Sequence, residues 1–466
     1  MHFLLFRIPI TFDNPRYTTL GYETISYPPL GLMYIASSLE NNGHIVDIID
    51  LDFEYFSSVE LSKKLSNIDA VGLEVYTYNH EEVGCFARKI KELNPKIPII
   101  IGGPHCMFFK DKSLEDIEYA DIVVIGEGEE TIVEISLYLQ GRKKLSDIYN
   151  ISYRKNGKIF HGKGFKILRN LDDLSYPSRH LVDEYDYDIS PRGIFYKKRL
   201  TLMMTSRGCP SACLFCSRYG NSYYNYGFRQ RSAENVVNEI LSIDKKYRSV
   251  MIVDDSFLFD SKRSHKIFDM LIEKKSEIDI LIMGARVDSA DEELYEKMKK
   301  ANVTFIGFGI ESGNQDVLDF YNKNINLDQI RKAVFLAKKM GFQIAGTFIF
   351  GAPIETKEHF KRTIQFSKLL PLDIAIFNVL IYKMGSPLWI KAVKNKIIRK
   401  DEFFVISGSN RGLGSFTTEE LFRYLRKAYY EFYLRPSYII SRIKDCSIRR
   451  NFDPIKKGSK IFNSIR

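Results

Sequence analysis

The chain has 466 residues, of which 45% are apolar, which predicts a globular protein of two to four packed domains. No stretch approaches the ~18 apolar residues of a membrane span. The first residues lack the basic start and the small-residue cleavage site of a secretory signal, so we expect a cytoplasmic protein. The net charge of +10 is concentrated in residues 391–466, which contain 18 basic and seven acidic residues.

Short apolar runs alternate with polar helical segments in residues 1–145. The expected strands are at 3–8, 45–49, 70–75, 97–101 and 122–125, with helices at 28–42 and 81–93. This alternation predicts a doubly wound, Rossmann-like parallel sheet. Such sheets bind ligands beyond the carboxyl ends of their strands.

The residues expected at those strand ends are candidates for binding a large flat ligand, because their glycines let the backbone approach it closely. They are Tyr76, Thr77, Gly102, Gly103, Pro104, His105, Gly126, Glu127 and Gly128.

Residues 146–195 lack sustained periodicity, so we expect a hairpin and a linker between two domains. Residues 151–160 predict the hairpin, with a type I′ turn at Asn156 and Gly157. Residues 171–179 are interrupted by proline and predict the linker itself.

Three of the six cysteines lie on one short stretch, as Cys209, Cys213 and Cys216. Three thiolates can each hold one iron of a [4Fe–4S] cubane and leave the fourth iron open to a small molecule. A disulfide would leave an odd thiol in a chain without a secretory signal. Zinc would need a fourth ligand, commonly from a second cysteine pair, which is absent. The spacing therefore indicates an iron–sulfur cluster.

The alternation of strands and helices resumes in residues 196–390. Six strands are expected, at 200–205, 249–253, 279–285, 304–310, 344–350 and 373–379, and they predict a partial (β/α)6 barrel of the TIM type. Sites in such barrels form at the carboxyl ends of the strands. The candidate site residues there are Asp254, Asp255, Ser256, Arg286, Glu311, Ser312 and Gly351.

Residues 391–466 predict a basic helical extension. Residues 417–420 form a helix start signal that leads into an aromatic-rich helix at 421–436. The basic residues predict a solvated face, or contact with an anionic substrate or a lipid surface. The aromatic and glycine organisation of an RNA-binding module is absent, and we expect no nucleic-acid partner.

The cysteine loop, set between Arg207-Gly208 and Phe215, resembles that of the radical S-adenosylmethionine (SAM) enzymes, and the strand-end residues follow the same family pattern. Four further signatures resemble the cobalamin-binding domain that many of these enzymes carry. They lie at residues 27–36, 43–50, 102–105 and 126–130. Residues 432–436 resemble a run found in the class B methyltransferase and anaerobic cyclase-like branches.

The resemblance implies that Cys209, Cys213 and Cys216 ligate a [4Fe–4S] cluster whose open iron chelates SAM, and that one electron cleaves SAM to a 5′-deoxyadenosyl radical. It places the SAM amino group at residues 254–256, the SAM carboxylate at Arg286, the ribose at Glu311 and adenine near Gly351. The electron would come from a donor such as ferredoxin or flavodoxin. Asp-x-His-x-x-Gly is absent, so no protein histidine is expected to ligate the cobalt.

The resulting hypothesis is an anaerobic enzyme that methylates an unactivated carbon of a small molecule or lipid with cobalamin. The first alternative is radical cyclisation or C–C bond formation on a lipid or tetrapyrrole-like substrate. The second is a non-catalytic cobalamin or iron–sulfur sensor, against which the SAM landmarks argue. It also stays open that the first domain keeps the fold, docks on the barrel and binds nothing.

Overall fold

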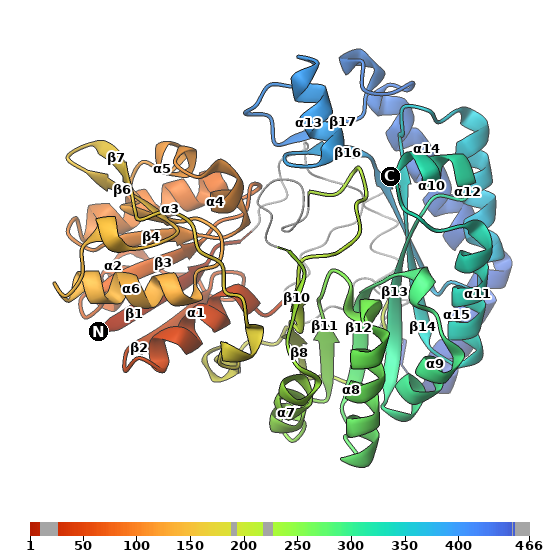
Figure 1. Ribbon diagram of the computed structural model, residues 1–466, viewed down its shortest axis with the longest axis horizontal. Coiled ribbons are helices and arrows are strands. Elements are labelled where there is room, and N and C mark those ends of the chain that lie inside the picture. Colours follow the sequence, from red (N-terminus) through yellow and green to blue (C-terminus); the bar gives the residue numbers. More distant parts are fainter. Residues whose placement is uncertain (10–26, 188–192, 218–226, 450, 453–466) are drawn as a thin grey trace. The chain divides into compact units, whose positions relative to one another are not determined.

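The computed structural model describes residues 1–9, 27–187, 193–217, 227–449 and 451–452. These residues form two compact units (Figure 1). The first unit contains residues 1–9 and 28–187. The second contains Tyr27 and the described residues from 193 to 452.

The first unit is built on a seven-stranded sheet with the order β2-β1-β3-β4-β5-β6-β7. Its first five strands in that order are parallel, and the β5–β6 and β6–β7 pairings are antiparallel. The strands are β1 (His2–Arg7), β2 (Ile45–Asp50), β3 (Ala70–Glu74), β4 (Ile99–Gly102), β5 (Ile122–Val124), β6 (Ile151–Lys155) and β7 (Lys158–His161).

Helices cover both faces of this sheet, so the predicted doubly wound architecture is confirmed. One apolar core joins the sheet to α1 and α6, and a second core joins its other face to α2, α3 and α5. The helices of this unit are α1 (Leu30–Glu40), α2 (Ser58–Leu65), α3 (His80–Leu93), α4 (Pro104–Phe109), α5 (Lys112–Asp116) and α6 (Glu129–Leu139).

The predicted hairpin is present, but it belongs to the sheet of the first unit. Asn156 and Gly157 have φ angles of 50° and 74°, as a type I′ turn requires. Strand β6 pairs with β5, and Tyr187 further along donates a hydrogen bond to Asp50 at 2.9 Å. The first unit therefore continues to residue 187, which differs from the boundary at residue 145 expected from the sequence, because the following segment packs on the same sheet.

The second unit contains six parallel strands in the order β15-β14-β13-β12-β11-β8, as predicted. The order is consecutive and does not close, which gives a partial barrel. The strands are β8 (Leu200–Met203), β11 (Ser249–Ile252), β12 (Asp279–Ala285), β13 (Val303–Glu311), β14 (Gln343–Phe350) and β15 (Ile374–Val379).

Helices form an outer layer on this sheet (Figure 1). They are α7 (Ala233–Ile243), α8 (Ser261–Glu273), α9 (Glu292–Lys300), α10 (Gln315–Phe320), α11 (Leu327–Lys339) and α12 (Lys357–Leu369). Buried apolar side chains of the longer helices contribute to one core with the strands. The six units leave the carboxyl ends of the strands free to carry a site.

The carboxyl-terminal part includes α13 (Pro387–Lys394), a small β16–β17 pair (Ile381–Lys383 with Phe404–Ile406), α14 (Thr418–Tyr433) and α15 (Pro436–Arg449). Helix α14 begins at the predicted Thr417–Glu420 capping box. Its Leu421, Leu425 and Phe432 are buried in the barrel core, so this helix is part of the barrel's packing. Among the described residues, none of the helices is long and apolar enough to span a bilayer.

Candidate functional site

The cysteine loop follows β8 at the carboxyl edge of the second sheet. Its first residues form a short strand, β9 (Ser206–Arg207), paired with β10 (Arg229–Gln230). Gly208 has a φ of 83°, and a Cβ there would lie 2.6 Å from the carbonyl oxygen of Gly227, so glycine is required. Cys213 is buried, and Cys209 and Cys216 are half-buried.

Asp254, at the end of β11, fixes the entry of this loop. Its carboxylate accepts hydrogen bonds from the Thr205 amide at 2.6 Å, the Thr205 hydroxyl at 2.5 Å and the Ser206 hydroxyl at 2.6 Å. Burial raises the pKa of Asp254, and these bonds oppose the shift. Both of its oxygens are engaged by the loop, so Asp254 positions the loop. The two other predicted site residues of this segment differ in exposure, because Asp255 is exposed and Ser256 is buried.

A buried arginine on α8 reinforces this anchor. Arg263 donates to the carbonyl oxygens of Thr205 at 3.0 Å and Arg231 at 2.7 Å. Arg231 is itself buried and paired with Glu239. Sequence reasoning missed these residues, because nothing in the local pattern distinguishes them from surface charges on a helix.

A second segment, residues 321–323 after α10, contacts the middle of the cysteine loop around Cys213. The Asn322 amide nitrogen donates to the Ala212 carbonyl oxygen, and the Leu214 backbone amide donates to the Tyr321 carbonyl oxygen, both at 2.9 Å. The rings of Tyr321 and Phe215 pack edge to face at 5.0 Å between centroids. These contacts hold the residues on either side of the central thiol.

The predicted Glu311 lies beside this segment, in an ion pair with Lys323 at 2.7 Å. Both side chains are only 8% exposed. A register shift between Gly309 and Glu311 and a φ of 68° at Glu311 turn its carboxylate toward Lys323. A Cβ at Gly309 would lie 2.6 Å from the Glu311 Oε1 and 2.9 Å from the Lys323 Nζ, so glycine makes room for the pair.

Two of the three guanidinium nitrogens of the predicted Arg286 bond to protein oxygens. Its Nε and Nη2 donate to both Asp288 oxygens at 2.8 to 3.2 Å, and Nη2 also donates to the Lys323 carbonyl oxygen at 3.0 Å. These bonds fix the guanidinium beside Lys323 and leave Nη1 without a hydrogen-bond partner among the described residues. Arg286 is thus brought to the same place as Glu311.

Three cations influence the thiols. Burial raises the pKa of the Cys213 thiol, and the positive charges of Lys323 and Arg286 oppose that shift. Although burial alone would lower the pKa of the Lys323 ammonium, Glu311 and Cys213 raise it above its ordinary value. Burial lowers the pKa of Lys383, with Cys216 acting in the opposite direction. On balance the pKa of the Cys213 thiol lies above its ordinary value, so burial outweighs the two cations.

These residues fit a [4Fe–4S] cluster in donor chemistry and charge. Within the described part of the chain, no three His, Cys, Asp or Glu side chains converge on a single point as ligands of one metal ion do. A cubane does not require such convergence, because each of its thiolates ligates a different iron. Three thiols on one anchored loop beside cations suit an anionic cluster.

Ser312 and Gly351 have mainly structural contacts. The Ser312 hydroxyl is fully buried and lies 3.3 Å from the Thr363 hydroxyl, so it faces α12. Gly351 has a φ of 107°, and its amide donates to Glu355 at 2.6 Å. Burial raises the pKa of Glu355 to about 8. Both residues shape turns at the strand ends.

In the first unit, the predicted ligand-binding residues gather at the carboxyl edge of β3, β4 and β5. These strands are neighbours in the sheet. The Val75 amide donates to the Gly102 carbonyl at 2.8 Å, and the His105 amide donates to the Val75 carbonyl at 3.1 Å. Thr77 is buried next to His80, whose ring nitrogen lies 2.9 Å from the Thr77 carbonyl oxygen. Backbone hydrogen bonds therefore join the segments that follow β3 and β4.

Some side chains at this edge are already engaged. Tyr76 donates to Glu74 at 3.1 Å, and Glu127 accepts from the Leu168 amide at 3.0 Å. Pro104 opens α4. Gly126 has a φ of 97°, a conformation that favours glycine. A Cβ at Gly128 would lie 2.8 Å from the Ile35 Cδ1, so a larger residue there would displace that side chain.

His105, another residue expected at this edge, has a buried side chain. Its ring is buried and stacks on Phe109 at 4.4 Å and His80 at 5.0 Å between centroids. In the described part of the chain, neither ring nitrogen has a hydrogen-bond partner. Burial lowers the pKa of His105 to about 3, so the ring is a neutral packing element.

The sequence analysis did not predict a buried polar cluster, formed around Arg7, at the same edge of the sheet. Arg7, at the end of β1, pairs with Asp50 at 2.9 Å and with Asp52 at 3.2 Å. Burial raises the pKa of the nearby Glu74, and Arg7 opposes the shift. The sequence signal was the position of Arg7 at the end of an otherwise apolar strand.

Replacing Gly103 with alanine should destabilise the first unit. Gly103 has a φ of 116°, and a Cβ would lie 2.8 Å from the Val75 carbonyl oxygen, so we expect a loss of about 2–4 kcal/mol from backbone strain and displacement. Urea unfolding measures the change. Gly141→Ala is the control, because Gly141 also has a positive φ of 74° but nothing within 4 Å of its Cβ position. Equal losses in the two variants would contradict the role of the contact with Val75.

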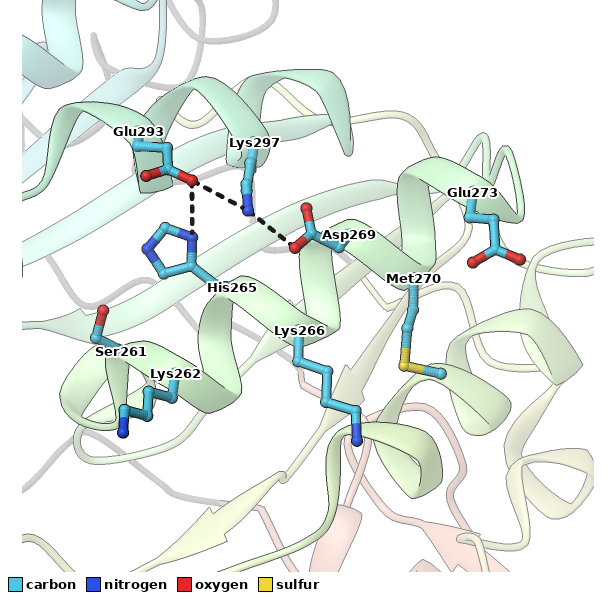
Figure 2. A pocket seen from close by; sticks show the side chains of 9 residues that line it. All are labelled: Ser261, Lys262, His265, Lys266, Asp269, Met270, Glu273, Glu293 and Lys297. Atoms are coloured by element: carbon cyan, nitrogen blue, oxygen red, sulfur yellow. Dashed lines mark hydrogen bonds and ion pairs between the residues drawn. The ribbon is translucent and has the colours of Figure 1, made fainter.

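A surface pocket between α8 and α9 is separate from these strand ends (Figure 2). Lys297 lies in it, 2.8 Å from Asp269 and 3.3 Å from Glu293, and His265 points toward Glu293 at 3.9 Å. These four side chains are therefore paired with one another. The pocket belongs to the outer helical layer, where barrel enzymes do not place their sites.

The fold and site define a class: a partial barrel with an anchored three-cysteine loop, in one chain with a doubly wound sheet domain whose strand ends are rich in glycine. Two family models agree with this class. The radical SAM superfamily model matches residues 203–367, and the B12 binding domain model matches residues 24–136.

Curated relatives extend the match over most of the chain. An uncharacterized methyltransferase of Pyrococcus horikoshii is 32% identical over 426 residues, covering 89% of this chain and 90% of that protein. The anaerobic magnesium-protoporphyrin IX monomethyl ester cyclase of Rubrivivax gelatinosus is 26% identical over 388 residues, covering 78% and 66%. The chain belongs to the family of radical SAM enzymes with a B12-binding domain.

A solved structure shows the same fold. The radical SAM methyltransferase TsrM from Kitasatospora setae, with cobalamin and a [4Fe–4S] cluster bound, aligns with a TM-score of 0.69 at 16% identity, over 84% of this chain and 75% of that one. Membership of the family assigns a [4Fe–4S] cluster, SAM and cobalamin as the cofactors of this chain. It is an enzyme of the cobalamin-dependent radical SAM methyltransferase type.

Proposed function

We propose that this enzyme transfers a methyl group to an unactivated carbon of a small molecule or lipid. The observation that carries the proposal is the cysteine loop anchored by Asp254 and residues 321–323, in a chain that also has a B12-binding domain. When bound, the cluster and cobalamin supply the electron and the methyl group respectively. A ferredoxin or flavodoxin is the expected electron donor.

The protein's own residues bind and orient the reactants. Cys209, Cys213 and Cys216 would hold the cluster. Glu311, with one oxygen fixed by Lys323, would accept a hydrogen bond from the SAM ribose through the other. Arg286 would offer Nη1 to the SAM carboxylate while Asp288 fixes its plane.

In the first unit, the glycine-rich edge at residues 102–103 and 126–128 would lie against the corrin. Close backbone approach there depends on glycine. The sequence contains no Asp-x-His-x-x-Gly motif and His105 is buried, which supports cobalt without a histidine ligand from this chain.

The test is anaerobic reconstitution with iron, sulfide and methylcobalamin, followed by incubation with methyl-deuterated SAM, dithionite and candidate substrates. We expect 5′-deoxyadenosine, S-adenosylhomocysteine and a deuterated methyl product. The control is protein treated in the same way but without added iron. Absence of 5′-deoxyadenosine under every condition would refute radical chemistry.

Radical cyclisation is the second candidate, favoured by the similarity to the Rubrivivax gelatinosus cyclase. The same experiment separates the two candidates. Cyclisation forms 5′-deoxyadenosine without S-adenosylhomocysteine and leaves no deuterated methyl group in the product.

A further inference from the structure

Helix α15 (Pro436–Arg449) has one face fixed to the second unit. Tyr438 donates to the Asp373 carbonyl oxygen at 2.9 Å, and Arg442 donates to the Gly193 carbonyl oxygen at 2.9 Å. Cys446, one turn further along, is buried. The sequence positions of these three residues repeat every four residues and so define the inner face of the helix.

The opposite face of α15 presents isoleucines to solvent. Ile439, Ile440 and Ile443 are 42%, 66% and 48% exposed, and Ile448 is 71% exposed. Positions 439, 440 and 443 are neighbours on a helical surface. The inner face holds the helix on the second unit through Tyr438 and Arg442, and the outer row stays accessible to solvent. Clustered exposed apolar side chains mark an interaction surface.

Positive charge on this helix and in the sequence after it indicates which kind of surface binds the exposed isoleucines. Lys444 is exposed and has no ion pair among the described residues. The sequence from residue 449 to 466 adds six basic residues and one acidic residue. An apolar helix face that carries an exposed lysine, in a chain segment of net positive charge, suits a surface that is apolar inside and anionic outside, which is the surface of an anionic bilayer. A second copy of the same face would bring like charges together.

We propose that the outer face of α15 lies in the interface of an anionic lipid bilayer and holds the second unit at the membrane surface. The isoleucines enter the boundary between headgroups and acyl chains, and Lys444 remains at the headgroups. This inference is independent of the reaction that the enzyme catalyses. It would give a lipid-soluble substrate a short path to the enzyme.

The test is flotation of the full chain with phosphatidylcholine vesicles that contain or lack phosphatidylglycerol. We expect binding to the anionic vesicles, weakening with added salt. Ile440→Ser/Ile443→Ser should reduce the partition coefficient by about tenfold or more, because two apolar side chains lose their burial. Ile45→Ser is the matched control, since Ile45 is 64% exposed in the first unit and should leave binding unchanged.

Lys444→Glu should reduce binding to the anionic vesicles and leave binding to neutral ones unchanged. Circular dichroism checks that each variant is folded, and the single Ile440→Ser variant replaces the double variant if that one is not. No vesicle binding by the parent chain, or equal binding by parent and double variant, would overturn the proposal. So would a dimer in sedimentation velocity that the double variant dissolves, which would assign this face to a second copy.

Discussion

A Cys213→Ala variant, reconstituted anaerobically with iron and sulfide, is expected to lack the visible absorbance of a [4Fe–4S] cluster and to form no 5′-deoxyadenosine. Cys213 is the buried central thiol, and its neighbours on both sides are fixed by residues 321 and 322. Cys209 and Cys216 each hold another iron, and the other three cysteines lie outside the loop, so none replaces Cys213. Iron and sulfide content per chain measures the loss.

Cys85→Ala is the matched control for that variant. Cys85 is an exposed free cysteine on α3 in the first unit, and its removal should leave the iron content and the absorbance unchanged. A cluster retained at full occupancy in Cys213→Ala would show that the ligand assignment is wrong.

Lys323→Met should destabilise the iron-free protein by about 3–5 kcal/mol, because it leaves the Glu311 carboxylate buried without its partner. Urea unfolding followed by circular dichroism measures the loss. The double variant Lys323→Met/Glu311→Met should recover part of the stability, because it removes the unpaired charge as well.

The control for this prediction is Lys339→Met. Lys339 and Glu292 lie 2.8 Å apart, nearly the same separation, but both side chains are exposed. Water screens that pair, so its loss should have little effect on unfolding. Equal effects of the two substitutions would contradict the importance of burial at Lys323.

Sequence reasoning predicted the strands and the placement of site residues at their ends, because both follow from local periodicity and from one rule about parallel sheets. It could not tell which of those residues face inward. Asp254 and Ser256 are adjacent to the exposed Asp255 in sequence, yet the first anchors the loop through three hydrogen bonds. Such roles depend on tertiary contacts that leave no local pattern.

Lys323 illustrates what sequence reasoning misses most easily. It lies between two asparagines in a polar stretch, which reads as a surface turn. The structure buries it against Glu311, twelve residues earlier in the chain. The extent of the first unit was missed for a similar reason, since Tyr187 reaches Asp50 across 137 residues.

The contact between residues 321–322 and the cysteine loop also implies an order in which parts of the cluster site form during synthesis. Asn322 holds Ala212 across 110 residues of chain, and the strands between them must pair before that bond can form. During synthesis the thiols therefore leave the ribosome well before their support exists. The loop gains this support only after the fourth strand of the barrel is made, and a chain stalled earlier would expose three unprotected thiols to oxidation.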